Sequence, residues 1–220
     1  MIFWRRPKSL TQLNPKLEIR KLRKLTKILI VDDEKDSFPI ESLQNNGYTI
    51  EHWPEVKDLE KLVNGDFDII VLDIKGVAAS ICKEDGFGIL EHIKQRNPSQ
   101  IVIAFSGQNF DIGKSHFFKM ADDVLCKPAL LVECTRMLDA IIESKITVSH
   151  YWESICEMLC REGATPKQIA SIENRILKAI TKGQRSSVSE LQFSDIAKHA
   201  NTAVTCASLA LKIFELTGQT

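Results

Sequence analysis

Phe67-Asp68-Ile69-Ile70-Val71-Leu72-Asp73 is the stretch of sequence that decides the fold of this chain. Ile69 to Leu72 form an unbroken apolar run, which is typical of a strand buried on both faces of a parallel sheet. Asp73 follows at the carboxyl end of that strand, and ligand sites of open α/β sheets form at this edge. Because a carboxylate is costly to bury inside a sheet, the role of Asp73 depends on what ends the other strands.

Four further segments have the composition of strands, and they cover residues 28–31, 48–53, 101–105 and 124–126. Helices are expected after Asp33 as far as Asn46-Gly47 and at residues 56–63, 88–95, 112–120 and 130–143. Five strands that alternate with five helices predict a five-stranded, parallel, doubly wound (flavodoxin-like) α/β sheet. This domain is expected to span residues 27–145, after an N-terminal extension of residues 1–26 with a short helix at 15–25.

Residues 146–220 are predicted to form a small all-α domain. A helix is expected at 148–161, and Thr165-Pro166-Lys167-Gln168 has the N-cap, first-turn proline and capping-box glutamine of a helix start. Isoleucines continue that second helix as far as Ile180. Gly183 to Ser187 is predicted to be a polar linker, followed by helices at about 188–199 and 202–217.

The composition is that of an ordinary globular protein. Of 220 residues, 44% are hydrophobic and 26% charged, which supports a sizeable core. No apolar run approaches the roughly 20 residues of a membrane-spanning helix, and the N-terminus lacks the apolar segment of a secretory signal. The six cysteines contain no CxxC pair, which favours reduced thiols and a cytoplasmic location. They are Cys82, Cys126, Cys134, Cys156, Cys160 and Cys206.

The charge is unevenly distributed along the chain, although its net value is zero. Residues 1–27 hold nine Lys and Arg against the single acid Glu18, a net charge of +8, and the remainder carries 20 basic and 28 acidic residues, a net charge of −8. A basic arm of this kind can meet nucleic acid or anionic lipid. It can equally fold back on the acidic body or remain a solvated tail.

The ends of the predicted strands carry side chains that could take part in chemistry. Asp32-Asp33 follow the first strand, Asp73 the third, Ser106 the fourth and Lys127 the fifth. In a parallel sheet these ends share one edge, where three carboxylates repel one another and require a cation such as Mg²⁺. A lysine and a hydroxyl beside them could hold phosphoryl oxygens, and Asp73 could then attack phosphorus as a nucleophile.

These residues lie in four segments that together resemble the receiver domains of two-component response regulators. The segments are ILIVDDE (28–34), DIIVLDI (68–74), VIAFSG (102–107) and ADDVLCKP (121–128). The spacings of 40, 33 and 21 residues between Asp33, Asp73, Ser106 and Lys127 suit the family. The resemblance covers roughly residues 28–144 and identifies 27–145 as a receiver domain.

The resemblance implies a role for each of these residues. Asp73 is expected to accept a phosphoryl group from a histidine kinase or phosphotransfer protein. Asp32, Asp33, Asp73 and the backbone carbonyl of Lys75 are expected to arrange Mg²⁺. A protein of this kind signals, and it is not an enzyme beyond catalysing its own phosphorylation and dephosphorylation.

The resemblance also implies how the phosphoryl group is held. Ser106 is expected to bond a phosphoryl oxygen and Lys127 to pair with the phosphate, while Gly107 is small enough to leave access to the aspartate. The Lys127–Pro128 peptide bond is expected to be cis, which is otherwise the minority state of X-Pro bonds.

Three features depart from the family pattern. The helix after Asp33 is shorter than usual. The loop after Asp73 lacks a Met-Pro pair and is longer around Ala78–Glu84, so it could alter partner choice or phosphate lifetime. Val124 stands where the family usually carries a switch Tyr or Phe. These departures leave open a receiver fold that signals without phosphorylation.

Other chemistries fit the residues less well. A dehalogenase-type phosphatase needs a second carboxylate two positions after the nucleophile, and that position is Lys75. A dinucleotide-binding domain needs a glycine-rich turn after the first strand, where this chain has acidic residues. His150 lacks the acidic neighbour of a kinase phospho-histidine, and Cys156 and Cys160 have no third and fourth zinc ligand.

The output of the C-terminal helices is the open part of the prediction. Phe193 to Lys198 faintly resembles the first helix of a helix-turn-helix, but residues 202–211 contain no Arg or Lys for phosphate and base contacts. Residues 145–220 carry nine basic and seven acidic side chains. This balance favours a protein-interaction or homodimerisation module, and the alternative is a phosphorylation-regulated, DNA-binding transcriptional regulator.

Overall fold

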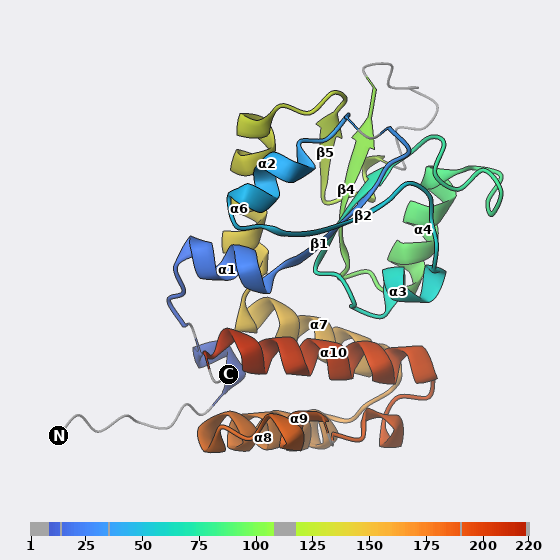
Figure 1. The fold of residues 1–220 in the computed structure, drawn as a ribbon. Coiled ribbons are helices and arrows are strands. Elements are labelled where there is room, and N and C mark those ends of the chain that lie inside the picture. Colours follow the sequence, from blue (N-terminus) through green and yellow to red (C-terminus); the bar gives the residue numbers. More distant parts are fainter. Residues whose placement is uncertain (1–8, 14, 35, 108–117, 190, 219–220) are drawn as a thin grey trace. The chain divides into compact units, whose positions relative to one another are not determined.

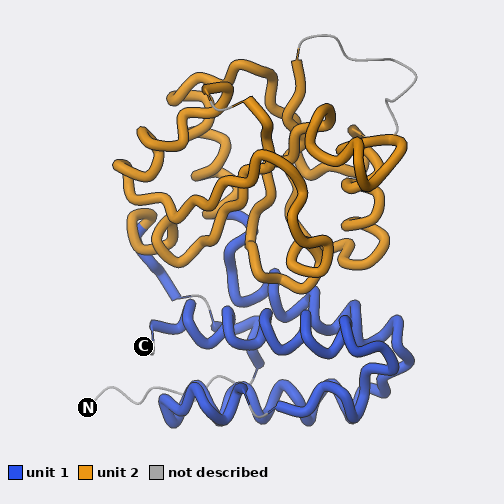
Figure 2. The backbone as a smooth tube through the Cα atoms, turned by 45° about the vertical axis from the view of Figure 1, so that its right-hand side comes forward, with its two compact units in different colours: residues 1–18, 144–220 blue, residues 19–143 orange. Residues whose placement is uncertain are grey.

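The computed structural model describes residues 9–13, 15–34, 36–107, 118–189 and 191–218. The chain forms two compact units (Figure 2). Residues 19–143 make one of them, called the α/β unit below, and residues 1–18 together with 144–220 make the other, called the helical unit. The described residues nearest to the two ends of the chain, 9–13 and 191–218, therefore belong to the same unit.

The α/β unit is built on one parallel sheet (Figure 1). The strand order is β2-β1-β3-β4-β5, with all neighbours parallel. This order confirms the predicted flavodoxin-like fold class and places β1 beside β3 at its centre. The strands are β1 (Lys27–Val31), β2 (Thr49–Trp53), β3 (Ile69–Asp73), β4 (Ile101–Ser106) and β5 (Asp123–Cys126).

The register of the strands brings their carboxyl ends level. Val31 pairs with Leu72, Asp73 with Phe105, and Ser106 with Cys126. All five residues of β3 are buried, as its apolar run predicts for a central strand. Residues that directly follow β1, β3, β4 and β5 consequently share one edge of the sheet.

Helices cover both faces of this sheet, with α2 and α6 on one side and α3 and α4 on the other (Figure 1). The helix predicted at 56–63 begins only at Leu59, because Asp58 caps it by accepting hydrogen bonds from the amides of Glu60 and Lys61. The helix predicted at 112–120 lies mostly outside the described residues. The helices of this unit are α1 (Ile19–Leu25), α2 (Ile40–Asn45), α3 (Leu59–Val63), α4 (Gly86–Arg96) and α6 (Leu131–Lys145).

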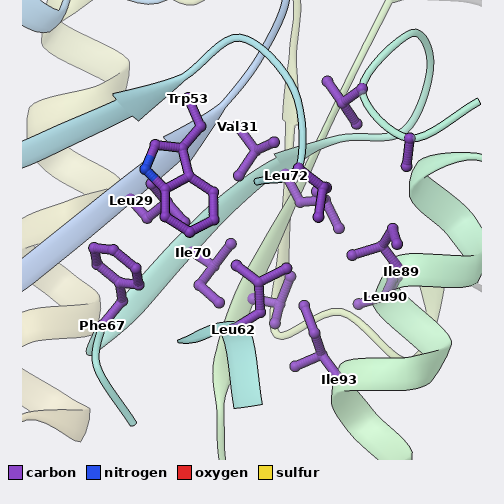
Figure 3. Close-up of a cluster of buried hydrophobic side chains, with 14 of the residues drawn as sticks. Leu29, Val31, Trp53, Leu62, Phe67, Ile70, Leu72, Ile89, Leu90 and Ile93 are labelled. Atoms are coloured by element: carbon purple, nitrogen blue, oxygen red, sulfur yellow. The ribbon is translucent and has the colours of Figure 1, made fainter. Parts of the chain in front are cut away.

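The larger described core cluster lies between the sheet and the helices α3 and α4 (Figure 3). Leu29, Ile70 and Leu72 from the strands meet Leu62 of α3 and Ile93 of α4 in this cluster. Burying one aliphatic side chain of this kind stabilises a fold by about 1.5–3 kcal/mol. The same packing holds β1 and β3, and therefore the residues at their ends, in fixed positions.

Helix α1 is attached to the α/β unit by a polar cluster. Arg23 donates two hydrogen bonds to Asp139 of α6, from Nε to Oδ1 at 2.9 Å and from Nη2 to Oδ2 at 2.5 Å. The Tyr48 hydroxyl donates to Asp139 Oδ1 at 2.6 Å, and the guanidinium of Arg23 lies 4.6 Å from the centre of the Tyr48 ring. A bidentate Arg–carboxylate pair with a third donor is a strong arrangement. This part of the basic extension is therefore fixed and not a solvated tail.

The helical unit is formed mainly by three long helices, and α10 packs along α7 (Figure 1). The predicted capping box is confirmed, since the Thr165 side chain accepts from the Gln168 amide and the Gln168 side chain accepts from the Thr165 amide. The elements are η1 (Leu10–Gln12), α7 (Val148–Arg161), α8 (Pro166–Lys182), α9 (Arg185–Ser189), η3 (Phe193–Asp195) and α10 (Ala200–Leu216). None of the helices in the described part of the chain is both long and apolar enough for a membrane span.

The predicted helix at 188–199 and the predicted linker at 183–187 are wrong in detail. Gly183 ends α8 with a φ of +63°, and the short helix α9 begins at Arg185, inside the expected linker. Phe193 then buries its ring from the 3-10 turn η3. Tertiary burial of this ring, which the local pattern does not specify, outweighs the helical pattern of the segment.

The described residues 9–13 and 15–18 of the N-terminal segment are part of the helical unit. Leu10 is fully buried, and Glu173 of α8 accepts hydrogen bonds from the Ser9 hydroxyl at 2.7 Å and from the Leu10 amide at 2.8 Å. Its basic residues Arg5, Arg6 and Lys8 lie outside the described residues. The described segment therefore contributes to a core, which its charge pattern did not indicate.

Asp139→Asn is expected to lower the free energy of unfolding by about 1–3 kcal/mol at pH 7, since Arg23 loses its bidentate partner. Burial raises the pKa of Asp139, but the hydrogen bonds from Arg23 and Tyr48 outweigh it and leave the pKa below its ordinary value. This stabilisation is present above the ordinary carboxyl pKa of about 3.9 and is lost as the pH falls through the lower folded-state pKa. Urea unfolding of both proteins between pH 7 and pH 3 measures the difference.

The matched control is Glu143→Gln, which neutralises an exposed acid on the same helix. We expect it to change the free energy of unfolding by less than about 0.5 kcal/mol. An equal loss in both variants would mean that the net charge of α6, and not the Arg23–Asp139 pair, accounts for the effect.

Candidate functional site

Three aspartates meet at the carboxyl edge of the sheet. Carboxylate oxygens of Asp32, Asp33 and Asp73 all lie within 4.8 Å of one another. Asp32 and Asp73 are buried and Asp33 is exposed. The pairing of β1 with β3 produces this cluster, because Val31 and Leu72 are opposite each other and the acids come directly after them. The structure thus brings together the three acids that the sequence analysis selected.

Lys127 bridges the two buried acids. Its Nζ donates to Asp73 Oδ2 at 2.6 Å and to Asp32 Oδ1 at 2.7 Å, and it lies 3.6 Å from a carboxylate oxygen of Glu34. Nζ is also 5.1 Å from the centre of the buried Phe105 ring. One ammonium group faces three clustered carboxylates, so the site keeps an excess of negative charge.

Burial and charge act against each other on these groups. Burial raises the pKa of the Asp73 carboxyl above its ordinary value, although the hydrogen bonds from Lys127 and from the Lys75 amide oppose the rise. Burial lowers the pKa of Lys127, but hydrogen bonds to Asp32 and Asp73 outweigh it and raise that pKa. Lys127 therefore stays protonated, and a cation near Asp73 would favour the carboxylate form that a nucleophile needs.

A second set of contacts holds Asp32 in place. The buried Ser37 hydroxyl donates a short hydrogen bond to Asp32 Oδ2, and the Ala129 amide donates to the Ser37 carbonyl at 2.9 Å. His52 Nε2 lies 2.8 Å from the Asp32 carbonyl oxygen. Sequence reasoning missed Ser37, because a serine a few residues after an acidic pair has no distinguishing pattern. The Lys127–Pro128 bond just before Ala129 is cis, as the resemblance implied.

Ser106 and Gly107 end β4 at the same edge. The Ser106 hydroxyl donates to the Gly107 carbonyl at 3.2 Å, and the Lys127 amide donates to the Ser106 carbonyl at 2.7 Å. Among the described residues, and apart from its chain neighbours, no heavy atom lies within 4 Å of where a Cβ on Gly107 would be. The site is a depression of ≈ 420 Å³, which is lined by Asp33, Glu34, Asp73, Lys75, Gly76, Ser106, Gly107 and Lys127.

The residues after Asp73 close around the acids. The Lys75 amide donates to Asp73 Oδ1 at 3.0 Å. Gly76 has a φ of +86°, and a Cβ at this position would lie 2.6 Å from Asp33 Oδ2. Only glycine fits here, for both its backbone angle and its closeness to the acid. Gly76 is a second site residue that the sequence analysis missed.

Val124 packs in a small apolar cluster beside the site. It lies against a core of Ile74, Phe87 and Ala104.

The donor set fits Mg²⁺. Hard carboxylate oxygens, gathered at an open depression with room for water, are the ligands that this ion prefers. Asp32, Asp33 and Asp73 supply those oxygens, and Lys75 lines the same depression. The excess of negative charge that Lys127 leaves uncompensated gives a physical reason for a divalent cation here.

Comparison with known proteins finds no matching family model and no matching curated protein. Solved structures do match. A CheY-like receiver domain protein from Methanospirillum hungatei is 24% identical over 54% of this chain and 94% of its own, with a TM-score of 0.45. Chemotaxis protein CheY4 of Vibrio cholerae is 21% identical over 53% of this chain and 98% of its own, with a TM-score of 0.43. The receiver domain of NtrX from Brucella abortus is 22% identical over 53% and 98%, with a TM-score of 0.44.

Residues 19–143 have a flavodoxin-like α/β fold. The all-parallel sheet with its strand order β2-β1-β3-β4-β5 shows this fold. The resemblance drawn from the four sequence segments is confirmed at the level of the fold.

Mg²⁺ at millimolar concentration is expected to raise the thermal midpoint of the protein, because a ligand that binds only the folded state stabilises it. Asp33→Asn should remove most of this shift by taking one carboxylate from the cluster. Differential scanning calorimetry with and without MgCl₂ measures both.

Asp36→Asn is the matched control, since Asp36 is an exposed acid only three residues away. It should keep the full Mg²⁺ shift. If Asp33→Asn and Asp36→Asn respond to Mg²⁺ alike, the cation effect is a general one on surface charge and the site assignment fails.

Proposed function

We propose that this protein is a two-component response regulator whose Asp73 accepts a phosphoryl group from a histidine kinase or phosphotransfer protein. One observation carries the proposal above the others. Lys127 Nζ bonds Asp73 and Asp32 together at a sheet edge where a third carboxylate lies within reach. A nucleophilic carboxylate, a fixed cation and a cluster of metal ligands are the parts that phosphoryl transfer to an aspartate requires.

The transfer step involves one bond made and one bond broken. An oxygen of the Asp73 carboxylate forms a bond to phosphorus, and the bond from phosphorus to the donor's histidine nitrogen breaks with its electron pair on nitrogen. The product is an acyl phosphate on Asp73. Water attacking the same phosphorus later returns the carboxylate and inorganic phosphate.

Lys127 and Ser106 hold the transferred group in this proposal. Lys127 Nζ bonds Asp73 Oδ2 before transfer and would pair with a phosphoryl oxygen after it. The positive charge of Lys127 therefore lies beside a negative charge both before and after the transfer. The Ser106 hydroxyl donates a 3.2 Å bond to the neighbouring Gly107 carbonyl, and a rotation about its side chain would redirect it to a phosphoryl oxygen.

Mg²⁺ bound by Asp32, Asp33, Asp73 and the carbonyl of Lys75 would neutralise charge on the phosphoryl oxygens. The chain's own contribution is to keep these ligands in position. Ser37 holds the Asp32 carboxylate, and the Lys75 amide holds Asp73 Oδ1, which leaves the other carboxylate oxygen to Lys127. Because the protein is itself the acceptor, we propose a signalling role and no enzymatic action on a separate substrate.

The helical unit is the proposed output. Helix α10 buries Cys206, Leu209, Ile213 and Phe214, so it is a core helix of this unit. Its one basic residue, Lys212, lies 4.0 Å from Glu215 of the same helix. A helix that reads DNA needs exposed basic side chains along one face. These features support protein interaction, with a target protein or a second copy, over DNA recognition by α10.

Asp73→Asn is expected to abolish labelling by radioactive acetyl phosphate in the presence of Mg²⁺, since an amide does not form the acyl phosphate. The label on the wild-type protein should be lost in alkali or hydroxylamine, as an acyl phosphate is. Filter-bound radioactivity of the intact chain measures the reaction.

Asp66→Asn is the control, because Asp66 is an exposed aspartate just before the other end of the same strand. It should be labelled as the wild-type protein is. Labelling that persists in Asp73→Asn would place the phosphoryl acceptor elsewhere and contradict the proposal.

Beryllofluoride, a mimic of the acyl phosphate, is expected to change the hydrogen exchange of backbone amides in residues 148–216 of the full chain. An output role requires that binding of the mimic at Asp73 changes the structure or dynamics of these helices. Asp73→Asn should show no change under the same conditions. Exchange that responds only within residues 19–143 would contradict the role of the helical unit as output.

A further inference from the structure

The loop that follows Asp73 is closed by one carboxylate, that of Asp85. Asp85 Oδ2 accepts a hydrogen bond from the Gly76 amide at 2.5 Å, and Oδ1 accepts one from the Ala78 amide at 2.7 Å. Asp85 stands directly before α4, nine residues after Gly76. One side chain therefore ties the end of the loop back to its beginning.

The bond to Gly76 also determines how the preceding carbonyl points. The Gly76 N–H and the Lys75 C=O belong to the same planar peptide group, and in a trans peptide they point in opposite directions. Among the described residues the only cis bond is Lys127–Pro128, so this peptide is trans. By holding the N–H, Asp85 turns the Lys75 carbonyl away from itself.

This peptide lies beside the acidic cluster. A Cβ on Gly76 would lie 2.6 Å from Asp33 Oδ2, and both Lys75 and Gly76 line the depression that contains Asp73. The Lys75 carbonyl is thus on the peptide that borders the three carboxylates. Its direction decides whether it can serve as a ligand there.

Packing fixes both ends of the Asp85 contact. Val77 and Ala78 are buried in the core, and the Val77 carbonyl accepts from the Val56 amide at 2.8 Å. At the other end, a Cβ on Gly86 would collide with the Asp73 carbonyl oxygen, so the start of α4 lies against the end of β3. Asp85 has little freedom to move relative to Asp73.

The backbone conformation of Asp85 indicates that its side chain has a structural role. Its φ of +53° and ψ of −135° make it the only non-glycine residue with a positive φ in the described part of the chain. A conformation of this kind costs of order 1–3 kcal/mol and persists where the surroundings over-determine it. Glycine would adopt it freely, whereas only a side chain with two acceptors satisfies both amides.

We propose that Asp85 is a positioning residue of the metal site: its carboxylate orients the Lys75–Gly76 peptide so that the Lys75 carbonyl faces the cation held by the three aspartates. The inference rests on the proposed function, in which Lys75 contributes its carbonyl to Mg²⁺. Asp85 itself does not touch the cation. It acts through a backbone group, as outer residues of metal sites commonly do.

Asp85→Gly and Asp85→Asn test the inference on the full chain. Glycine removes the carboxylate but relieves the positive φ, so the variant is expected to fold with a thermal midpoint at or near that of the wild-type protein. Asparagine keeps one acceptor oxygen for two amides. Titration calorimetry with MgCl₂ should show a dissociation constant raised about tenfold by Asp85→Gly and by less in Asp85→Asn.

The charge-matched control is Glu84→Gln, which removes the neighbouring exposed acid of the same loop. It should leave the Mg²⁺ dissociation constant within about twofold of the wild-type value, since surface charges are screened. A rise equal to that of Asp85→Asn would overturn the positioning role in favour of a simple charge effect.

Labelling by acetyl phosphate across a Mg²⁺ series provides the second measurement. Asp85→Gly should need about tenfold more Mg²⁺ for half-maximal labelling and reach the wild-type rate at saturation, because Asp73, Ser106 and Lys127 are unchanged. Wild-type Mg²⁺ affinity in both Asp85 variants would overturn the inference alone. A wild-type protein that binds no Mg²⁺ would overturn the proposed metal site and this inference together.

Discussion

The concentration of negative charge at one edge of the sheet is the constraint on which the rest of the α/β unit depends. Two of the three carboxylates are buried, and Lys127 is the ammonium group that bonds both of them. Removing one partner from such a buried pair leaves an uncompensated charge, which is strongly destabilising. The surrounding elements therefore have a second task beside packing: Ser37, the Lys75 amide and the turn after β5 each hold one member of this charge cluster.

Most of the α/β architecture could be predicted because its signals are local. An unbroken apolar run such as Ile69–Leu72 specifies a central parallel strand, and five strand segments with helices between them leave few topologies. The acids could be selected for the same reason, since each stands directly after a strand. Parallel strands bring their carboxyl ends to one edge without any further information about distances.

What the sequence did not predict depends on contacts between distant parts of the chain. Ser37 and Asp85 act through hydrogen bonds that only the folded loops create, and a serine or aspartate in a loop has many ordinary explanations. The helix predicted at 188–199 is replaced by shorter elements because Phe193 is buried by the rest of the helical unit. Leu10, within a segment that looked like a charged tail, is fully buried for the same kind of reason.

One side chain, that of Asp85, joins the two ends of the loop after Asp73. The middle of this loop, around Ala78–Glu84, departs from the pattern of the receiver domains that the sequence resembles, and Ile81 there is exposed. Asp85 bonds to Gly76 and Ala78 across the whole of that segment, so the peptide nearest the acids is held by the two ends of the loop and not by its length. Residues between these ends can change the surface beside the site without moving the ligands. Because the carboxylate of Asp85 holds both ends of the loop, the length of the loop can change without a change in the geometry of the site.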